Sequence, residues 1–186
     1  RSSAASDVYK RQDMASKTQL AFARQVYAAA VEAKTEIDPA FVTAQAMLET
    51  GWGARVIGKA NLFGITKGSQ WDGDIVMVKT HEYFKTPKQK FKEPDRIVSV
   101  CKVAGKNLWY YTVMRAFKDF DSVGDCLKEH ERLFQKPGYK DAWPCRKDPF
   151  KFAQKICDGV GCKYATDPTY LTTITSIIKT IRRKCV

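Results

Sequence analysis

The stretch that decides the fold is residues 43–53, which read TAQAMLETGWG. Upstream, Asp38 followed by Pro39 predicts a helix start, because the Asp side chain accepts from free N–H groups and Pro fits the first helical position. Two glycines then end the predicted helix, which covers residues 39–50. One acidic residue, Glu49, lies near the end of this helix among apolar residues. Partial burial raises the pKa of a carboxyl group, so Glu49 is suited to stay protonated near neutral pH and act as a general acid.

A second motif, NLFGI, occupies residues 61–65. The pattern A-Q-x-x-L-E-[ST]-G-W-G followed by N-x-F-G-I resembles glycoside hydrolase family 73. These peptidoglycan-cleaving glucosaminidases occur in autolysins, flagellar rod hydrolases and phage lysis proteins. Residues 80–83 (THEY), 117–120 (FKDF) and 164–170 (YATDPTY) resemble further elements of the family in the same order.

This resemblance implies three catalytic residues. Glycosidic cleavage needs a proton donor for the leaving oxygen and a second group on the other side of the sugar ring. Glu49 is implied as the donor, Glu82 as the group that positions water or stabilises charge, and Tyr164 as a cleft tyrosine that orients the acetamido group or the water. From the residues alone, Glu82 also fits an exposed strand position among lysines, and Tyr164 also fits the core.

The same motifs supply candidate substrate-binding residues. Gly64 would allow close approach of a sugar to the backbone. The aromatic residues fit packing as well as sugar stacking, and Asp167 before Pro168 is most simply the cap of the last helix. The candidates are Trp52, Asn61, Phe63, Gly64, Trp71, Asp167 and Tyr170.

Composition predicts one catalytic domain, residues 14–186. The chain has 186 residues, 44% of them hydrophobic, and no run approaches the roughly 20 apolar residues of a membrane span. Residues 1–13 lack periodicity and are expected to be a leader segment outside the fold. No signal-peptide pattern is visible, so we expect synthesis in a host cytoplasm and action on the cell wall in the periplasm.

The formal net charge of +12 fits either a solvated basic surface or attraction to an anionic partner. Peptidoglycan, with its peptide carboxylates, qualifies. Nucleic acid is not expected, because the basic residues are dispersed and no nucleic-acid-binding motif is present. The basic end of the last helix also suits contact with an anionic envelope surface.

No metal or other cofactor is expected. The six cysteines, Cys101, Cys126, Cys145, Cys157, Cys162 and Cys185, include no CxxC pair, and the two histidines, His81 and His130, lie far from Cys157 and Cys162 in sequence. Structural thiols or one late-forming bridge are the open alternatives.

Periodicity predicts an α+β fold that is mostly helical with a small antiparallel β lobe, which agrees with the lysozyme-like fold that the family resemblance implies. Apolar spacing favours helices over residues 16–35, 39–50, 122–135, 150–158 and 169–183, and β-branched and aromatic runs favour strands over 75–78, 97–103 and 108–117.

The function that follows is a monomeric endo-β-N-acetylglucosaminidase that cleaves the glycan strand of peptidoglycan, as a phage or prophage endolysin. A muramidase or lytic transglycosylase is the alternative within enzymes, because lysozyme-like folds share a glutamate at a helix end. An inactive wall-binding or assembly protein is the alternative outside enzymes.

Overall fold

The computed structural model describes residues 16–159, 164–165 and 167–186, so the predicted leader lies outside the described residues. The elements in chain order are α2 (Lys17–Glu32), α3 (Pro39–Thr50), β1 (Ile75–Phe84), β2 (Arg96–Lys102), β3 (Trp109–Lys118), α4 (Val123–Phe134), α5 (Pro149–Asp158) and α6 (Tyr170–Lys184), with 3-10 turns at Pro137–Tyr139 and Trp143–Cys145 between α4 and α5. The predicted α+β fold is confirmed. None of the described helices is long and apolar enough to cross a membrane.

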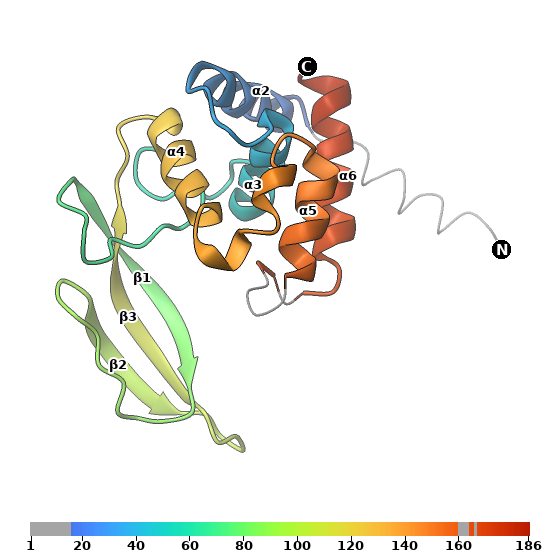
Figure 1. The fold of residues 1–186 in the computed structure, drawn as a ribbon. Helices are drawn as coiled ribbons and strands as arrows, with labels where there is room; N and C mark the ends of the chain where they lie inside the picture. The colour runs from blue at the N-terminus through green and yellow to red at the C-terminus, as the bar shows by residue number, and fades with distance from the viewer. Residues whose placement is uncertain (1–15, 160–163, 166) are drawn as a thin grey trace.

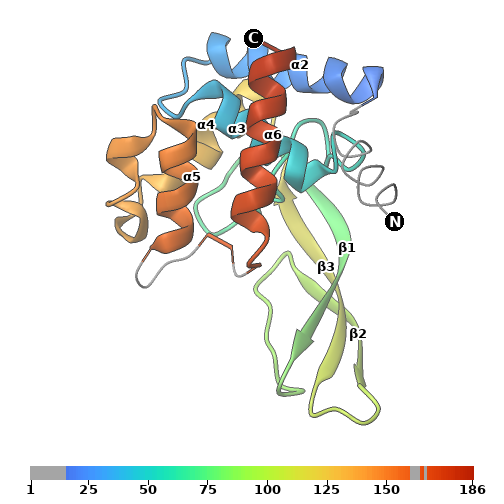
Figure 2. The ribbon, with the colours of Figure 1, turned by 90° about the vertical axis from the view of Figure 1, so that its right-hand side faces the viewer.

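The helices gather in one lobe, and the three strands project from it as a second, narrow lobe (Figures 1 and 2). The sheet is antiparallel with the order β1-β3-β2. β1 is longer than the expected residues 75–78, because every residue from Ile75 to Phe84 pairs with β3. The segment that contains Glu82 is therefore part of a strand.

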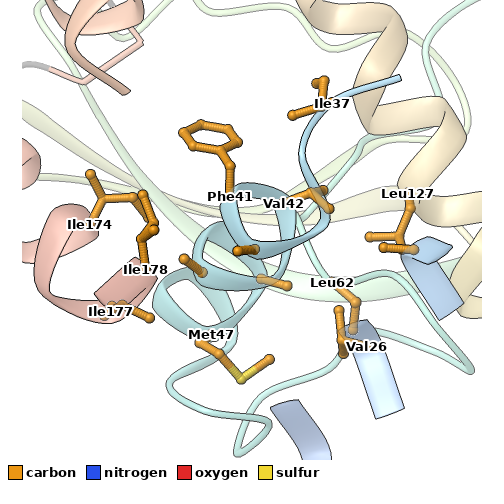
Figure 3. Packing of buried hydrophobic residues seen from close by; sticks show 14 of the residues in the cluster. Val26, Ile37, Phe41, Val42, Met47, Leu62, Leu127, Ile174, Ile177 and Ile178 are labelled. Atoms are coloured by element: carbon orange, nitrogen blue, oxygen red, sulfur yellow. The ribbon is translucent and has the colours of Figure 1, made fainter. Parts of the chain in front are cut away.

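α3 is the centre of the helical core. Phe41 is fully buried and its ring packs at 4.8 Å against Phe152 and at 6.3 Å against Phe134. Figure 3 shows isoleucines of α6 on one side of α3 and Val26 and Leu127 on the other. Because α3 is enclosed by α2, α4, α5 and α6, its C-terminal end is held in a fixed position.

Side-chain caps explain several helix boundaries. Asp38 Oδ1 accepts from the N–H groups of Ala40 and Phe41, with Pro39 at the first position of α3, as predicted. Ser122 likewise caps α4 by accepting from Asp125 N. A capping residue and proline at the start of a helix satisfy or remove N–H groups that have no partner within the helix.

The predicted start of the last helix is wrong. Asp167 is not its cap and Pro168 is not its first residue: α6 begins at Tyr170 after Thr169. Asp167 Oδ1 accepts from both the N–H and the hydroxyl of Thr169, each at 2.8 Å. These bonds hold a turn before the helix, so α6 starts later than the Asp-Pro pair suggested.

Candidate active site

Glu49 lies in the last turn of α3, directly before a tight reversal of the chain. Gly51 caps the helix in the left-handed conformation, with φ 58°, and Trp52 N donates to Met47 O. Gly53 follows with φ 85°, and a Cβ on it would lie 2.6 Å from the Phe22 ring. Glycine is therefore required at 53 for both backbone conformation and space, which explains the Gly-Trp-Gly sequence after Glu49.

The Glu49 carboxyl group combines exposure with partial desolvation. The residue is exposed at the surface, and its Oε1 accepts a long hydrogen bond of 3.4 Å from the Tyr164 hydroxyl. Protein packed around the carboxyl raises its pKa, and the Tyr164 hydrogen bond lowers it by a smaller amount. The negative end of the α3 dipole also disfavours the carboxylate. Partial desolvation thus raises the pKa of Glu49, and its role as the catalytic acid stays a prediction.

Glu49 opens onto a pocket of about 360 Å³ that contains part of the second motif. The other lining residues are Arg55, Ile57, Asn61, Leu62, Phe63 and Gly64. Backbone hydrogen bonds between Ile57 and Asn61 in both directions close the loop that forms this wall. The structure therefore brings together Glu49, Tyr164, Asn61, Phe63 and Gly64, which are far apart in sequence.

Asn61 shapes this pocket from inside the protein. Its side chain is 1% exposed, its Nδ2 donates to the carbonyls of Ile65 and Lys118, and its Oδ1 accepts from Ile65 N. The amide thus ties the loop to the end of β3. Gly64, with φ 60°, lies against Phe117. Sugar binding by Asn61 remains a prediction, but its side chain already has these structural bonds.

A buried set of stacked and hydrogen-bonded side chains, which the sequence did not predict, supports the floor of the pocket. Phe63 stacks on His130, with ring centroids 3.6 Å apart, and His130 Nε2 lies 2.9 Å from Gln45 Oε1. Gln45 Nε2 donates to the Tyr170 hydroxyl, so its oxygen faces His130 and the His130 Nε2 carries the proton. Burial lowers the pKa of His130 to about 3, which keeps the ring neutral. The only sequence signal was a polar Gln45 in an otherwise apolar helix.

Four other predicted binding residues make contacts within the protein that support the fold. The hydroxyl of Tyr170, a residue that is 7% exposed, accepts from Gln45, and Asp167 holds the turn before α6. The Trp71 indole N–H donates to Asp74 O, and Lys118 Nζ lies 4.6 Å from the ring centroid. Trp52 packs against the core with φ 60°. Their roles in sugar binding stay predictions.

Glu82 lies on β1, outside the Glu49 pocket, where it forms an ion pair with Arg115. Arg115 also approaches Asp95, with 2.7 Å between Nε and Oδ2. Side chains alternate along a strand, and Arg115 and Phe117 therefore share one face of β3. Glu82, on the paired strand β1, lies on the same face of the sheet. Phe117, at the end of this face, lies next to Gly64 of the pocket. Glu82 therefore lies on the face of the sheet that borders the pocket.

The described part of the chain has no cluster of His, Cys, Asp or Glu suited to hold a metal ion. Cys101, Cys126, Cys145 and Cys185 are free thiols, and Cys162 lies outside the described residues. What the site offers chemically is a partly desolvated acid next to a tyrosine hydroxyl in an open pocket.

Comparisons with known proteins agree with this chemistry. The sequence profile of the glucosaminidase family, described as mannosyl-glycoprotein endo-beta-N-acetylglucosaminidase, matches residues 25–183. The peptidoglycan hydrolase FlgJ of Vibrio parahaemolyticus is 30% identical over 141 residues, which cover 72% of this chain and 37% of that protein. An autolysin of Enterococcus faecalis is 32% identical over 138 residues, which cover 73% of this chain and 16% of that protein. The chain thus spans well under half the length of these relatives.

Solved structures share the fold. The C-terminally truncated glycoside hydrolase domain of Salmonella typhimurium FlgJ matches with a TM-score of 0.63 at 22% identity, covering 89% of this chain and 98% of that domain. The likeness confirms the predicted lysozyme-like arrangement of helices and a small sheet.

Proposed function

The chain belongs to the glucosaminidase family of glycoside hydrolases, and we propose that it hydrolyses the β-1,4 bond after N-acetylglucosamine in the glycan strand of peptidoglycan. The observation that carries this proposal is the placement of Glu49 beside Tyr164 at the mouth of the Asn61–Gly64 pocket. Retaining and inverting glycosidases alike need one carboxyl group that remains protonated until the bond breaks. Glu49 has the surroundings that such an acid needs.

In the proposed reaction, Glu49 donates its proton to the glycosidic oxygen as the bond to the anomeric carbon breaks. The leaving sugar departs with a hydroxyl group, water adds to the positively charged anomeric carbon, and the proton that this water loses passes to a carboxylate base, which returns the enzyme to its starting charge. Tyr164 holds the Glu49 carboxylate that remains, through the hydrogen bond from its hydroxyl. Desolvation favours the protonated acid before the reaction, and the tyrosine stabilises the anion afterwards.

Glu82 is the proposed second carboxylate. Its ion pair with Arg115 holds the carboxylate in place on β1, on the lobe that faces the substrate from the side opposite Glu49. Glu82 stands on the β lobe and Glu49 on the helical lobe, so the separation of the two carboxyl groups depends on how far the lobes close around the substrate. Glu82→Gln should therefore slow turnover and leave binding to sacculi unchanged.

Arg55 favours peptidoglycan over a neutral glycan as the substrate. Its guanidinium lies over the end of α3, where a Cβ on Gly51 would be 3.4 Å from Nη2, and the residue is exposed in the Glu49 pocket. Among the described residues it has no ion-pair partner. A free guanidinium in a sugar pocket matches the carboxylates that peptidoglycan carries and neutral chito-oligosaccharides lack.

We also propose that the enzyme acts on the wall from the periplasm, in the lytic role of an endolysin. The basic character of the chain supports approach to an anionic wall. Expression in a Gram-negative host tests this role. Lysis should require export of the chain to the periplasm and an intact Glu49; export without lysis would contradict the lytic role and leave the bond specificity untouched.

The bond that is cleaved can be read from the products. Purified sacculi are digested, the new reducing ends are reduced with borohydride, and the fragments are identified by mass spectrometry. We expect reduced N-acetylglucosamine ends. Reduced muramic ends would indicate a muramidase, anhydro-muramic ends a lytic transglycosylase, and the absence of any product an inactive wall-binding protein.

A further inference from the structure

The positive charge of the protein is concentrated on the β lobe. Residues 75–118 contain ten Lys and Arg residues against three Asp and Glu residues, a formal charge of +7 out of the +12 of the whole chain. Eight of the ten are exposed and form no ion pair within the described structure: Lys79, Lys85, Lys88, Lys90, Lys92, Arg96, Lys102 and Lys106. This surface is called the basic lobe surface below.

The acids of the lobe do not neutralise this surface. Glu82 and Asp95 both approach the guanidinium of Arg115, and these three side chains are mostly buried. Glu93 is the one acid of the lobe left exposed. Since the paired acids face inward and the lysines face solvent, the field of the lobe outside the protein is positive.

The lysines between β1 and β2 stand on an ordered loop. The Tyr111 hydroxyl donates to Thr86 O and accepts from Gln89 N, both at 3.3 Å. Phe91 packs on the rings of Phe84 and Tyr111. At the end of the loop, Asp95 Oδ1 accepts from Ala116 N at 2.7 Å. These contacts order the backbone that carries Lys85, Lys88, Lys90 and Lys92, so binding to this loop costs less ordering entropy than binding to a free tail.

A hollow of about 520 Å³ lies between this loop and residues 66–69, and both Lys67 and Lys92 line it. Gly64, which lines the Glu49 pocket, is two residues before Thr66, which lines the hollow. Residues 64–66 thus join the two depressions along one continuous segment. A polymer that leaves the Glu49 pocket in this direction meets the lysines of the loop.

We propose that the basic lobe surface binds the carboxylates of the peptides on the glycan strand, at a distance from the bond that is cleaved. This inference rests on the proposed peptidoglycan substrate. It adds a second contact between enzyme and wall, in which the loop after β1 holds the polymer while the helical lobe carries Glu49. A neutral sugar chain gains nothing from this contact.

Binding to sacculi tests the proposal without relying on cleavage. The variant Lys85→Gln/Lys88→Gln/Lys90→Gln/Lys92→Gln is prepared in a Glu49→Gln background and sedimented with purified sacculi that have been freed of phosphate-containing polymers. Each exposed ion pair changes a binding constant by roughly 1.4- to 5-fold. Loss of four lysine–carboxylate pairs should therefore weaken binding to sacculi at least about fourfold at low salt. Amidation of the carboxyl groups of the sacculi should weaken binding of the protein that keeps its four lobe lysines to the level of the four-lysine variant.

The matched control removes four exposed lysines of the helical lobe, Lys136→Gln/Lys140→Gln/Lys155→Gln/Lys179→Gln, for the same change in net charge. This control should bind within about twofold of the parent. If the lobe variant melts at a lower temperature, Lys85→Gln and Lys90→Gln are measured singly in its place. Equal binding by lobe and control variants would overturn the inference, as would tighter binding to duplex DNA than to sacculi or binding that depends on wall phosphates. Failure of the unsubstituted enzyme to cleave sacculi would instead overturn the proposed function.

Discussion

Lowering the pH from 7 to 5 should destabilise the protein mainly through His130. This side chain is 3% exposed, stacks on Phe63 and donates to Gln45, and its surroundings include the neutral ring of Tyr164. Burial lowers its pKa to about 3, against 6.5 for an ordinary histidine. The unfolded chain therefore takes up a proton at pH 5 that the folded chain does not, so stability falls as the pH drops below about 6.5. At about 1.4 kcal/mol per pH unit, the loss is about 2 kcal/mol by pH 5.

Urea denaturation at pH 7 and pH 5 measures this loss directly, and the chain offers a matched control because it has only two histidines. His81 is exposed on β1 and stacks on Tyr110, so His81→Gln should leave the pH dependence unchanged. His130→Gln should lower stability at both pH values and reduce the difference between them by about 2 kcal/mol. If the two variants show the same difference as the parent, His130 is not the group that resists protonation, and the assigned hydrogen bond to Gln45 is wrong.

Three further predictions concern the site and its support. Tyr164→Phe removes the hydroxyl that donates to Glu49 and keeps the ring, so turnover should fall about tenfold with an unchanged melting temperature; lost stability with normal turnover would place the tyrosine in the core only. Phe41→Ala should cost about 3 to 5 kcal/mol of unfolding free energy, because the ring is fully buried, and a loss below about 1 kcal/mol would mean that α3 is not the centre of the core. Iodoacetamide should label exposed Cys101 rapidly and Cys126 only after unfolding, since burial raises the pKa of Cys126 to about 12; mass spectrometry that finds Cys126 labelled first would contradict its position.

The elements predicted well from sequence are those with local signals at their ends. Asp38-Pro39 and Gly51 define α3 without help from the rest of the chain, and the motif around Glu49 identified the family, which the profile match confirms. The end of β1 was predicted too early because, unlike the apolar run of residues 75–78, residues 79–82 carry polar side chains. Their strand conformation comes from pairing with β3, which is a tertiary effect.

The parts of the site that escaped prediction depend on contacts between distant residues. Arg55 follows the Glu49 motif, but only the folded loop makes it part of the pocket lining. The sequence presents His130 only as a candidate metal ligand, since nothing local signals that Phe63 and Gln45 would enclose it. For Asp167, the local rule gave a helix cap, whereas its hydrogen bonds to Thr169 hold a separate turn.

The most direct test of the account is the rate at which Glu49→Gln cleaves purified sacculi. The substitution keeps the size of the side chain and the hydrogen-bonding partner of Tyr164, and it removes the proton that the leaving oxygen needs. General acid catalysis contributes typically 10²- to 10⁴-fold in rate, so release of new reducing ends should fall at least about 100-fold while the melting temperature stays unchanged. Retention of more than about a tenth of the parent rate would contradict the assignment of Glu49 as the catalytic acid.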